Sequence, residues 1–135
     1  MAVEVLIVED NPGDADLIRH LLSEKPVPVK ITVACDGESA LRIIGTSQPD
    51  VVLLDINLPR IDGHQVLRSI RQSGDPEVVV IVMSSSLNPT DHHSALNAGA
   101  NEYMTKGHGL EEFERAMDEH VYKWVDAIAQ RKKMP

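Results

Sequence analysis

Short runs of hydrophobic residues alternate along the chain with segments in which hydrophobic residues recur every three or four positions. The runs are nearly continuous, which is typical of strands that are buried on both faces of a parallel sheet. Between them, hydrophobic residues on one face predict helices, the first carrying Leu17, Ile18, Leu21 and Leu22, and the fourth ending at Gly99. The runs predict strands at residues 3–8, 29–34, 51–54, 78–83 and 102–104.

This alternation predicts an α/β fold: a doubly wound five-stranded parallel sheet with helices on both faces. At 135 residues, the chain is long enough for one domain with a sizeable core, and we expect residues 1–135 to form that single domain. No repeat, linker or low-complexity tract interrupts the pattern.

Residues 110–131 differ from the other segments, because their hydrophobic stripe predicts one extended C-terminal helix. About 22 residues at ~1.5 Å each give roughly 33 Å, whereas strands of five or six residues make a sheet only about 17 to 20 Å deep. We therefore expect part of the stripe to overhang the sheet and to form a partner surface rather than a solvent-exposed tail. The residues assigned to this surface are Phe113, Tyr122, Trp124 and Ile128.

Composition narrows the possible functions. The longest uninterrupted hydrophobic stretch, residues 78–83, is far shorter than the ~18 residues that a membrane span needs. The net charge of -8 opposes binding to nucleic acid phosphates. The single cysteine, Cys35, cannot form an intrachain disulfide, and no signal peptide follows Met1, so we expect a reducing cytoplasm. Aromatic residues make up only 3% of the chain, and all four lie between Tyr103 and Trp124.

Polar residues follow the strands at the edge where open parallel sheets place their sites. The first strand leads to Glu9 and Asp10, the third to Asp55, the fourth to Ser84 and the fifth to Lys106. Carboxylates this close need a counter-charge, and hard oxygen ligands suit Mg²⁺. The set is suited to phosphoryl transfer onto Asp55, with Mg²⁺ and the lysine neutralising charge and the serine donating a hydrogen bond.

Each of these residues taken alone has a plainer interpretation. Asp55 could end a strand, Ser84 could lie in a turn, and Asp14 could cap the next helix. Their coincidence at the ends of consecutive strands favours a site. The six histidines show no metal-ligand spacing, and adjacent His92 and His93 point to different sides of a helix, so all six are interpreted as surface or cap residues.

Five motifs together resemble the receiver domain of two-component response regulators, which implies a flavodoxin-like receiver fold. The resemblance implies that Asp55 accepts a phosphoryl group from the phosphohistidine of a sensor histidine kinase. It also implies that Asp10 ligates Mg²⁺ directly, that Glu9 helps through water, and that the main-chain carbonyl of Asn57 is a further ligand. The motifs are 5–11, 50–55 with Leu58, Pro59, Asp62 and Gly63, then Ser84, then 98–100, and Tyr103 before Lys106.

The resemblance further implies a two-state switch. Lys106 would pair with the phosphoryl oxygens, Ser84 would close onto the phosphoryl group, and Tyr103 would swing inward into the space that Ser84 vacates. The switched surface would comprise the fourth helix, the fifth strand and the last helix. The chain departs from the family at Gly107, where proline after a cis bond is usual; a non-proline cis bond costs about 2.5 to 4 kcal/mol, so we expect a trans bond and a different loop.

Because few residues follow Lys133, we expect no output domain, and the chain resembles stand-alone receivers. Residues 9–18 are most similar to regulators paired with phytochrome-type histidine kinases, which often dimerise through the last strand and helix. A degenerate receiver that binds partners without phosphorylation is an alternative. A metal-dependent phosphatase is a weaker one, because it needs an acid two residues after its nucleophile, where this chain has Asn57. A flavin- or nucleotide-binding module is disfavoured, because it needs a phosphate-binding loop at the position where this chain has the acidic residues Glu9 and Asp10.

Overall fold

Five strands form one parallel sheet in the computed structural model, which describes residues 1–73 and 77–133. Their order across the sheet is β2-β1-β3-β4-β5, so the direction of winding reverses between β1 and β3. This confirms the predicted doubly wound sheet, whose site is expected beyond the carboxyl ends of the central strands. The strands are β1 (Val3–Val8), β2 (Val29–Ala34), β3 (Val51–Asp55), β4 (Val79–Ser84) and β5 (Glu102–Thr105).

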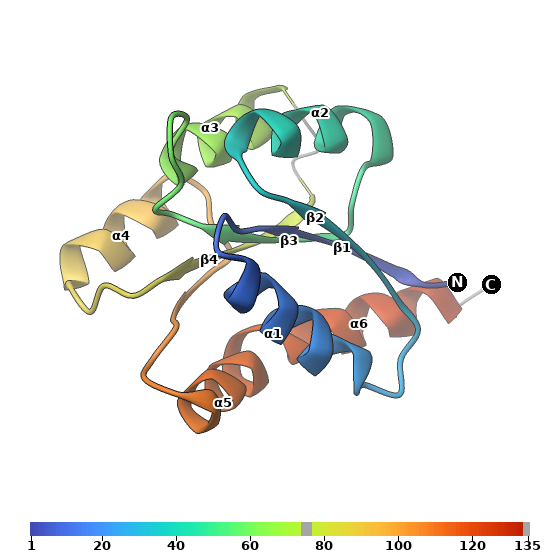
Figure 1. The fold of residues 1–135 in the computed structure, drawn as a ribbon. Coiled ribbons are helices and arrows are strands. Elements are labelled where there is room, and N and C mark those ends of the chain that lie inside the picture. Colours follow the sequence, from blue (N-terminus) through green and yellow to red (C-terminus); the bar gives the residue numbers. More distant parts are fainter. Residues whose placement is uncertain (74–76, 134–135) are drawn as a thin grey trace.

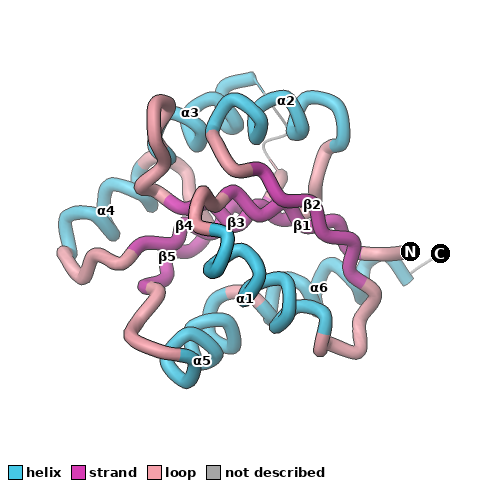
Figure 2. Tube along the Cα trace, in the orientation of Figure 1, coloured by secondary structure: helices cyan, strands magenta, loops and turns pink. Residues whose placement is uncertain are grey.

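Helices cover both faces of the sheet, as Figures 1 and 2 show. On one face lie α2, α3 and α4, and on the other lie α1, α5 and α6. Gly99 follows α4 with φ of 109°, a left-handed conformation that favours glycine and ends the helix where the sequence predicted. The helices are α1 (Pro12–Ser23), α2 (Gly37–Ser47), α3 (Gly63–Ser73), α4 (Pro89–Asn97), α5 (Leu110–His120) and α6 (Tyr122–Lys133).

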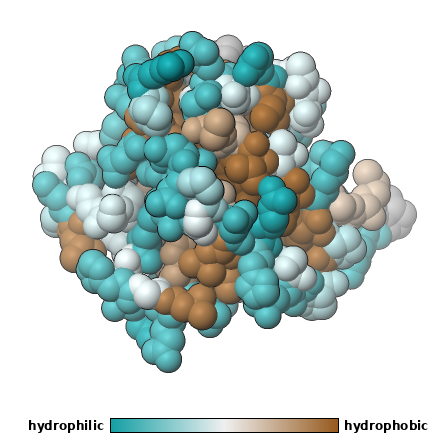
Figure 3. Space-filling view, viewed as in Figure 1, coloured by the Kyte–Doolittle hydropathy of each residue, from teal (hydrophilic) through white to brown (hydrophobic). Residues whose placement is uncertain are grey.

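The hydrophobic core has two layers, one on each side of the sheet. Successive strand residues point to opposite faces, so Ile7 packs toward α1, α5 and α6, while Leu6 and Val8 pack toward α2, α3 and α4. The strands β3 and β4 are buried along their whole length, which explains their continuous hydrophobic sequence. The edge strand β2 alternates between exposed and partly buried residues, and hydrophobic surface is visible around β2 and α1 in Figure 3.

The C-terminal segment is helical as predicted, but it is divided at Val121 into α5 and α6. The backbone of Val121 has φ of −110° and ψ of −52°, and α6 runs back beneath the sheet to the N-terminal end (Figure 1). The predicted overhang is wrong. The bend keeps the stripe on the sheet, and Phe113, Val121 and Ile128 are at most 4% exposed.

An ion pair fixes the end of α6 to the sheet. Lys132 Nζ lies 2.8 Å from Asp50 Oδ2, and it also donates a hydrogen bond to the carbonyl of Ala2. The same Asp50 oxygen accepts a hydrogen bond from the backbone N–H of Glu4. In the part of the chain that the structure describes, no helix is both long and hydrophobic enough to cross a membrane.

Candidate functional site

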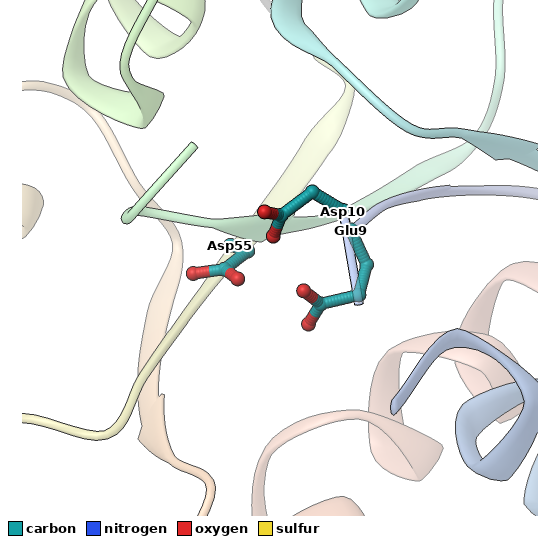
Figure 4. A group of neighbouring side chains, drawn as sticks. All are labelled: Glu9, Asp10 and Asp55. Atoms are coloured by element: carbon teal, nitrogen blue, oxygen red, sulfur yellow. The ribbon is translucent and has the colours of Figure 1, made fainter. Parts of the chain in front are cut away.

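An acidic cluster lies at the carboxyl ends of β1 and β3. Val8 pairs with Leu54 in the parallel register of these strands, so the next residues, Glu9 and Asp55, lie side by side. Both side chains are buried, at 2% and 4% exposure, whereas Asp10 points from the exposed start of the following loop. Figure 4 shows the three carboxylates turned toward a common space. The structure therefore brings together the three acids that the sequence assigned to this edge.

The cluster has the chemistry of a divalent cation site. One carboxylate oxygen from each of Glu9, Asp10 and Asp55 lies within 4.8 Å of the other two. Three hard oxygen donors of this kind suit Mg²⁺, which is commonly held by one or two carboxylates and keeps several waters. The donor set thus fits the ion that the sequence predicted.

Lys106 provides the positive charge within the cluster. Its Nζ lies 2.6 Å from Glu9 Oε1, 3.0 Å from Asp14 Oδ2 and 3.2 Å from Asp55 Oδ2. The backbone N–H of Lys106 donates to the carbonyl of Ser84 at 2.8 Å, so pairing between β4 and β5 continues to this residue. The lysine therefore reaches the phosphoacceptor position predicted from the sequence.

One ammonium faces several carboxylates in this cluster, and burial together with these charges shifts the pKa values of Glu9 and Lys106. Burial, followed by the neighbouring carboxyl of Asp55, raises the pKa of Glu9 from 4.5 to about 7, although Lys106 opposes this change. Burial alone would lower the pKa of Lys106, but hydrogen bonds to Glu9 and Asp14 and the charge of Asp55 raise it above its ordinary value. The surplus negative charge favours a bound divalent cation.

The loop after β5 holds Lys106 without a proline. The Lys106–Gly107 peptide bond is trans, as predicted. Gly107 has φ of 72°, and a Cβ there would lie 2.7 Å from the side chain of Glu112, so glycine suits this position. The Glu112 carboxylate accepts a hydrogen bond from the backbone N–H of His108, which ties the loop to the first turn of α5.

A second group of residues lines an open cleft of about 380 Å³ beside the acidic cluster, among them Asn57, Ser84 and Tyr103. The backbone N–H of Asn57 donates to Asp55 Oδ1 at 2.9 Å. Ser84 is fully buried, and its Oγ accepts a hydrogen bond from the backbone N–H of Ser86. The ring of Tyr103 is already directed inward, with 7% exposure, and its hydroxyl donates to the carbonyl of Ser86 at 3.1 Å.

Two residues at the site were missed in the sequence. Asp14 was considered only as a possible helix cap, but Asn11 caps α1 by accepting from the N–H groups of Gly13 and Asp14, and the Asp14 carboxylate binds Lys106 instead. No local signal identifies Asp14 as a partner of Lys106, because the two residues are 92 positions apart in the chain. His92 is on the surface, as predicted, but it also contacts Tyr103, which no local pattern indicated.

The residues assigned to a partner surface lie away from this site, on α5 and α6. Phe113 and Ile128 belong to the core of this chain. Tyr122 and Trp124 are partly exposed, and the indole N–H of Trp124 donates to Glu102 at 3.2 Å. Only the latter two therefore present surface in the predicted region.

Comparison with known proteins gives matches over most of the chain. Residues 5–118 match the response regulator receiver domain. The chain is 35% identical over 112 residues to the response regulator MprA of Mycolicibacterium vanbaalenii, and 34% identical to MprA of Mycobacterium tuberculosis strain H37Ra. Each alignment covers 83% of this chain but 47% of the relative, so the chain spans about half the length of the curated relatives it matches.

Solved structures of similar length share the fold. The phosphorylated cyanobacterial phytochrome response regulator RcpA has a TM-score of 0.85 and 30% identity, with 94% of this chain and 96% of that chain covered. The Mn²⁺-bound response regulator Rcp1 has a TM-score of 0.81 and 26% identity, with 91% and 94% covered.

Proposed function

The chain belongs to the response regulator receiver domain family, and from that premise we propose that it is a phosphoacceptor switch protein. Asp55 accepts a phosphoryl group from the phosphohistidine of a sensor histidine kinase in a Mg²⁺-dependent reaction. The observation that carries this proposal is the convergence of Glu9, Asp10, Asp55 and Lys106 at the switch point of the sheet. We further propose that residues 1–135 act as one receiver domain.

The chain's own residues supply the groups for the transfer. A carboxylate oxygen of Asp55 attacks phosphorus, the bond from phosphorus to the imidazole nitrogen breaks, and the electron pair remains on the imidazole. The backbone N–H of Asn57 and the ammonium of Lys106 hold the carboxylate oriented, at 2.9 and 3.2 Å. Glu9 and Asp10, with Asp55 and the carbonyl of Asn57, would hold Mg²⁺, which when bound neutralises charge on the transferred group.

Phosphorylation is read out through Ser84 and Tyr103. Transfer adds negative charge beside the Ser84 hydroxyl, which turns to donate to the phosphoryl group, and this favours the inward position of the Tyr103 ring. Lys106 then pairs with the phosphoryl oxygens. The affected surface comprises α4, β5 and α5. The complete acidic cluster supports this function over a receiver that acts without phosphorylation.

The protein acts catalytically only on its own phosphorylation and dephosphorylation. A phosphatase with an aspartyl nucleophile needs a general acid two residues later, and the side chain of Asn57 is an amide that does not donate a proton in this way. The net charge of -8 also supports a partner other than nucleic acid.

Intact-mass measurement with acetyl phosphate and Mg²⁺ tests the proposal. We expect the wild type to gain the mass of one phosphoryl group and Asp55→Asn to gain none. Asp16→Asn, which removes an exposed acid from α1, is the matched control and should behave as the wild type. No gain on the wild type, or equal gain on wild type and Asp55→Asn, would refute the assignment.

We propose a phytochrome-type sensor histidine kinase as the phosphodonor and a homodimer through the last strand and helix. Similarity to RcpA, described as a phytochrome response regulator, supports the first. The partly exposed Tyr122 and Trp124, with Leu110 at 52% exposure at the start of α5, support the second. Light scattering at high micromolar concentration, with and without a phosphoryl mimic, should detect a dimer in at least one state, and a monomer in both refutes it.

A further inference from the structure

The side chain of Tyr103 is held from two directions. Its hydroxyl donates to the carbonyl of Ser86, and its ring packs with the core layer beneath α4. One face of the ring is covered by His92, which lies on α4 and is exposed to solvent. The two rings are stacked, with centroids 5.0 Å apart and planes inclined by 8°. His92 therefore covers Tyr103 on the side of α4.

Ser86 connects these rings to the phosphoacceptor site. Its backbone N–H donates to Ser84 Oγ at 3.0 Å, and its own hydroxyl donates to Asp91 Oδ2 at 2.6 Å. Asp91 immediately precedes His92 in the first turn of α4. The loop between Ser84 and α4 thus contains the Ser86 carbonyl, which accepts a hydrogen bond from the Tyr103 hydroxyl. The same loop leads directly into α4, which holds His92.

From this arrangement we infer that His92 is a positioning residue that latches Tyr103 in its inward conformation. An outward rotation of Tyr103 separates the stacked rings and breaks the bond to Ser86. That this contact forms part of a phosphorylation switch rests on the proposed function. The contact itself belongs to the chain without phosphate.

The strength of the latch follows from the stacking. Offset or parallel aromatic pairs shift an equilibrium roughly two- to tenfold beyond the effect of buried area. Loss of the His92 ring should lower the ratio of inward to outward Tyr103 by that factor. His93 is an adjacent histidine on the same helix, also exposed, and the structure gives it no ring contact among the described residues, so it is a matched control.

The test uses NMR of the full chain with labelled tyrosine, in the absence of phosphodonor. The chain has two tyrosines, so a Tyr122→Phe background assigns the remaining ring signals to Tyr103. Three-bond couplings across the Cα–Cβ bond of Tyr103 depend on its χ1 rotamer, so they report the outward population independently of how much of the ring His92 covers. We expect His92→Ala to raise it roughly two- to tenfold, His93→Ala to leave it unchanged, and His92→Phe to restore the wild-type value.

The inference is overturned if His92→Ala has no effect, if His93→Ala has an equal effect, or if His92→Phe fails to restore the inward ring. Should His92→Ala not fold, the same comparison is made with His92→Gln, which is polar and has no ring. Because no phosphoryl group is present, these results are independent of whether Asp55 is phosphorylated. If the wild type gains no mass with acetyl phosphate, the proposed function is refuted, but the inference about His92 is unaffected.

Discussion

The raised pKa of Glu9 predicts that the metal-free protein loses stability as the pH rises from about 5 to 7.5. Glu9 has a pKa of about 7 in the folded chain, above its ordinary 4.5. Between these values the folded state binds more protons than the unfolded state, so the free energy of unfolding falls with pH. At about 1.4 kcal/mol per tenfold change in proton affinity, the full loss due to Glu9 is about 3 kcal/mol.

Urea unfolding followed by Trp124 fluorescence measures this loss. Wild type and Glu9→Gln are compared in chelator at pH 5 and 7.5, because titrating groups outside the acidic cluster contribute equally to both. We expect the wild type to lose about 2 to 2.5 kcal/mol more than Glu9→Gln between the two pH values, because part of the full loss falls outside this interval. Glu38→Gln, at an exposed position of α2, is the control and should retain the wild-type slope. Equal slopes in wild type and Glu9→Gln would refute the reasoning.

Mg²⁺ should counteract the loss, because it binds the ionised form of this cluster. At a concentration one hundred times its dissociation constant, a ligand that binds only the folded state stabilises it by about 2.7 kcal/mol. The wild type at pH 7.5 should therefore recover most of its stability with Mg²⁺, and removal of the metal should reverse the gain. Asp10→Asn should recover less, and an equal recovery would contradict the assignment of Asp10 to the metal. Two further substitutions test how the fold supports the site. Gly63→Ala should destabilise the protein by about 1 to 3 kcal/mol and slow phosphorylation, because its Cβ would lie 2.5 Å from the backbone of Ile56 next to the phosphoacceptor. The control, Gly45→Ala, meets no atom within 4 Å and should stabilise by about 0.5 to 1 kcal/mol, and chemical unfolding distinguishes the two. Lys132→Met should cost about 1 kcal/mol by removing the ion pair that fixes α6, whereas Lys133→Met should leave the midpoint unchanged, and an equal change would refute this role.

Much of the site was predictable because each strand is marked by a hydrophobic run that can be recognised from neighbouring residues alone. Continuous hydrophobic runs indicated strands, and parallel strands place their carboxyl ends at one edge, so Glu9, Asp10, Asp55, Ser84 and Lys106 could be assigned to that edge from the order of residues alone. The predicted bounds of β1 and β2 match those observed; β3 and β5 each extend one residue further at the C-terminal end, and β4 is shifted by one residue at both ends.

The contacts that sequence reasoning missed lie between residues on different elements of the fold. Lys106 and Asp14 are separated by 92 positions, so nothing in the neighbourhood of Asp14 distinguished an ion pair from a helix cap. His92 and Tyr103 stack because α4 packs beside β5, and a helical pattern does not specify which ring of the neighbouring strand it will meet.

The C-terminal segment shows the same division between sequence and tertiary structure. The spacing of hydrophobic residues by itself determined that residues 110–131 are helical and which side chains share a stripe. It did not determine the bend at Val121, because periodicity within a helix carries no information about the length of the surface it must cover. The bend at Val121 is set by the sheet, because burying the hydrophobic stripe over β1 is more favourable than leaving it exposed beyond the edge of the sheet.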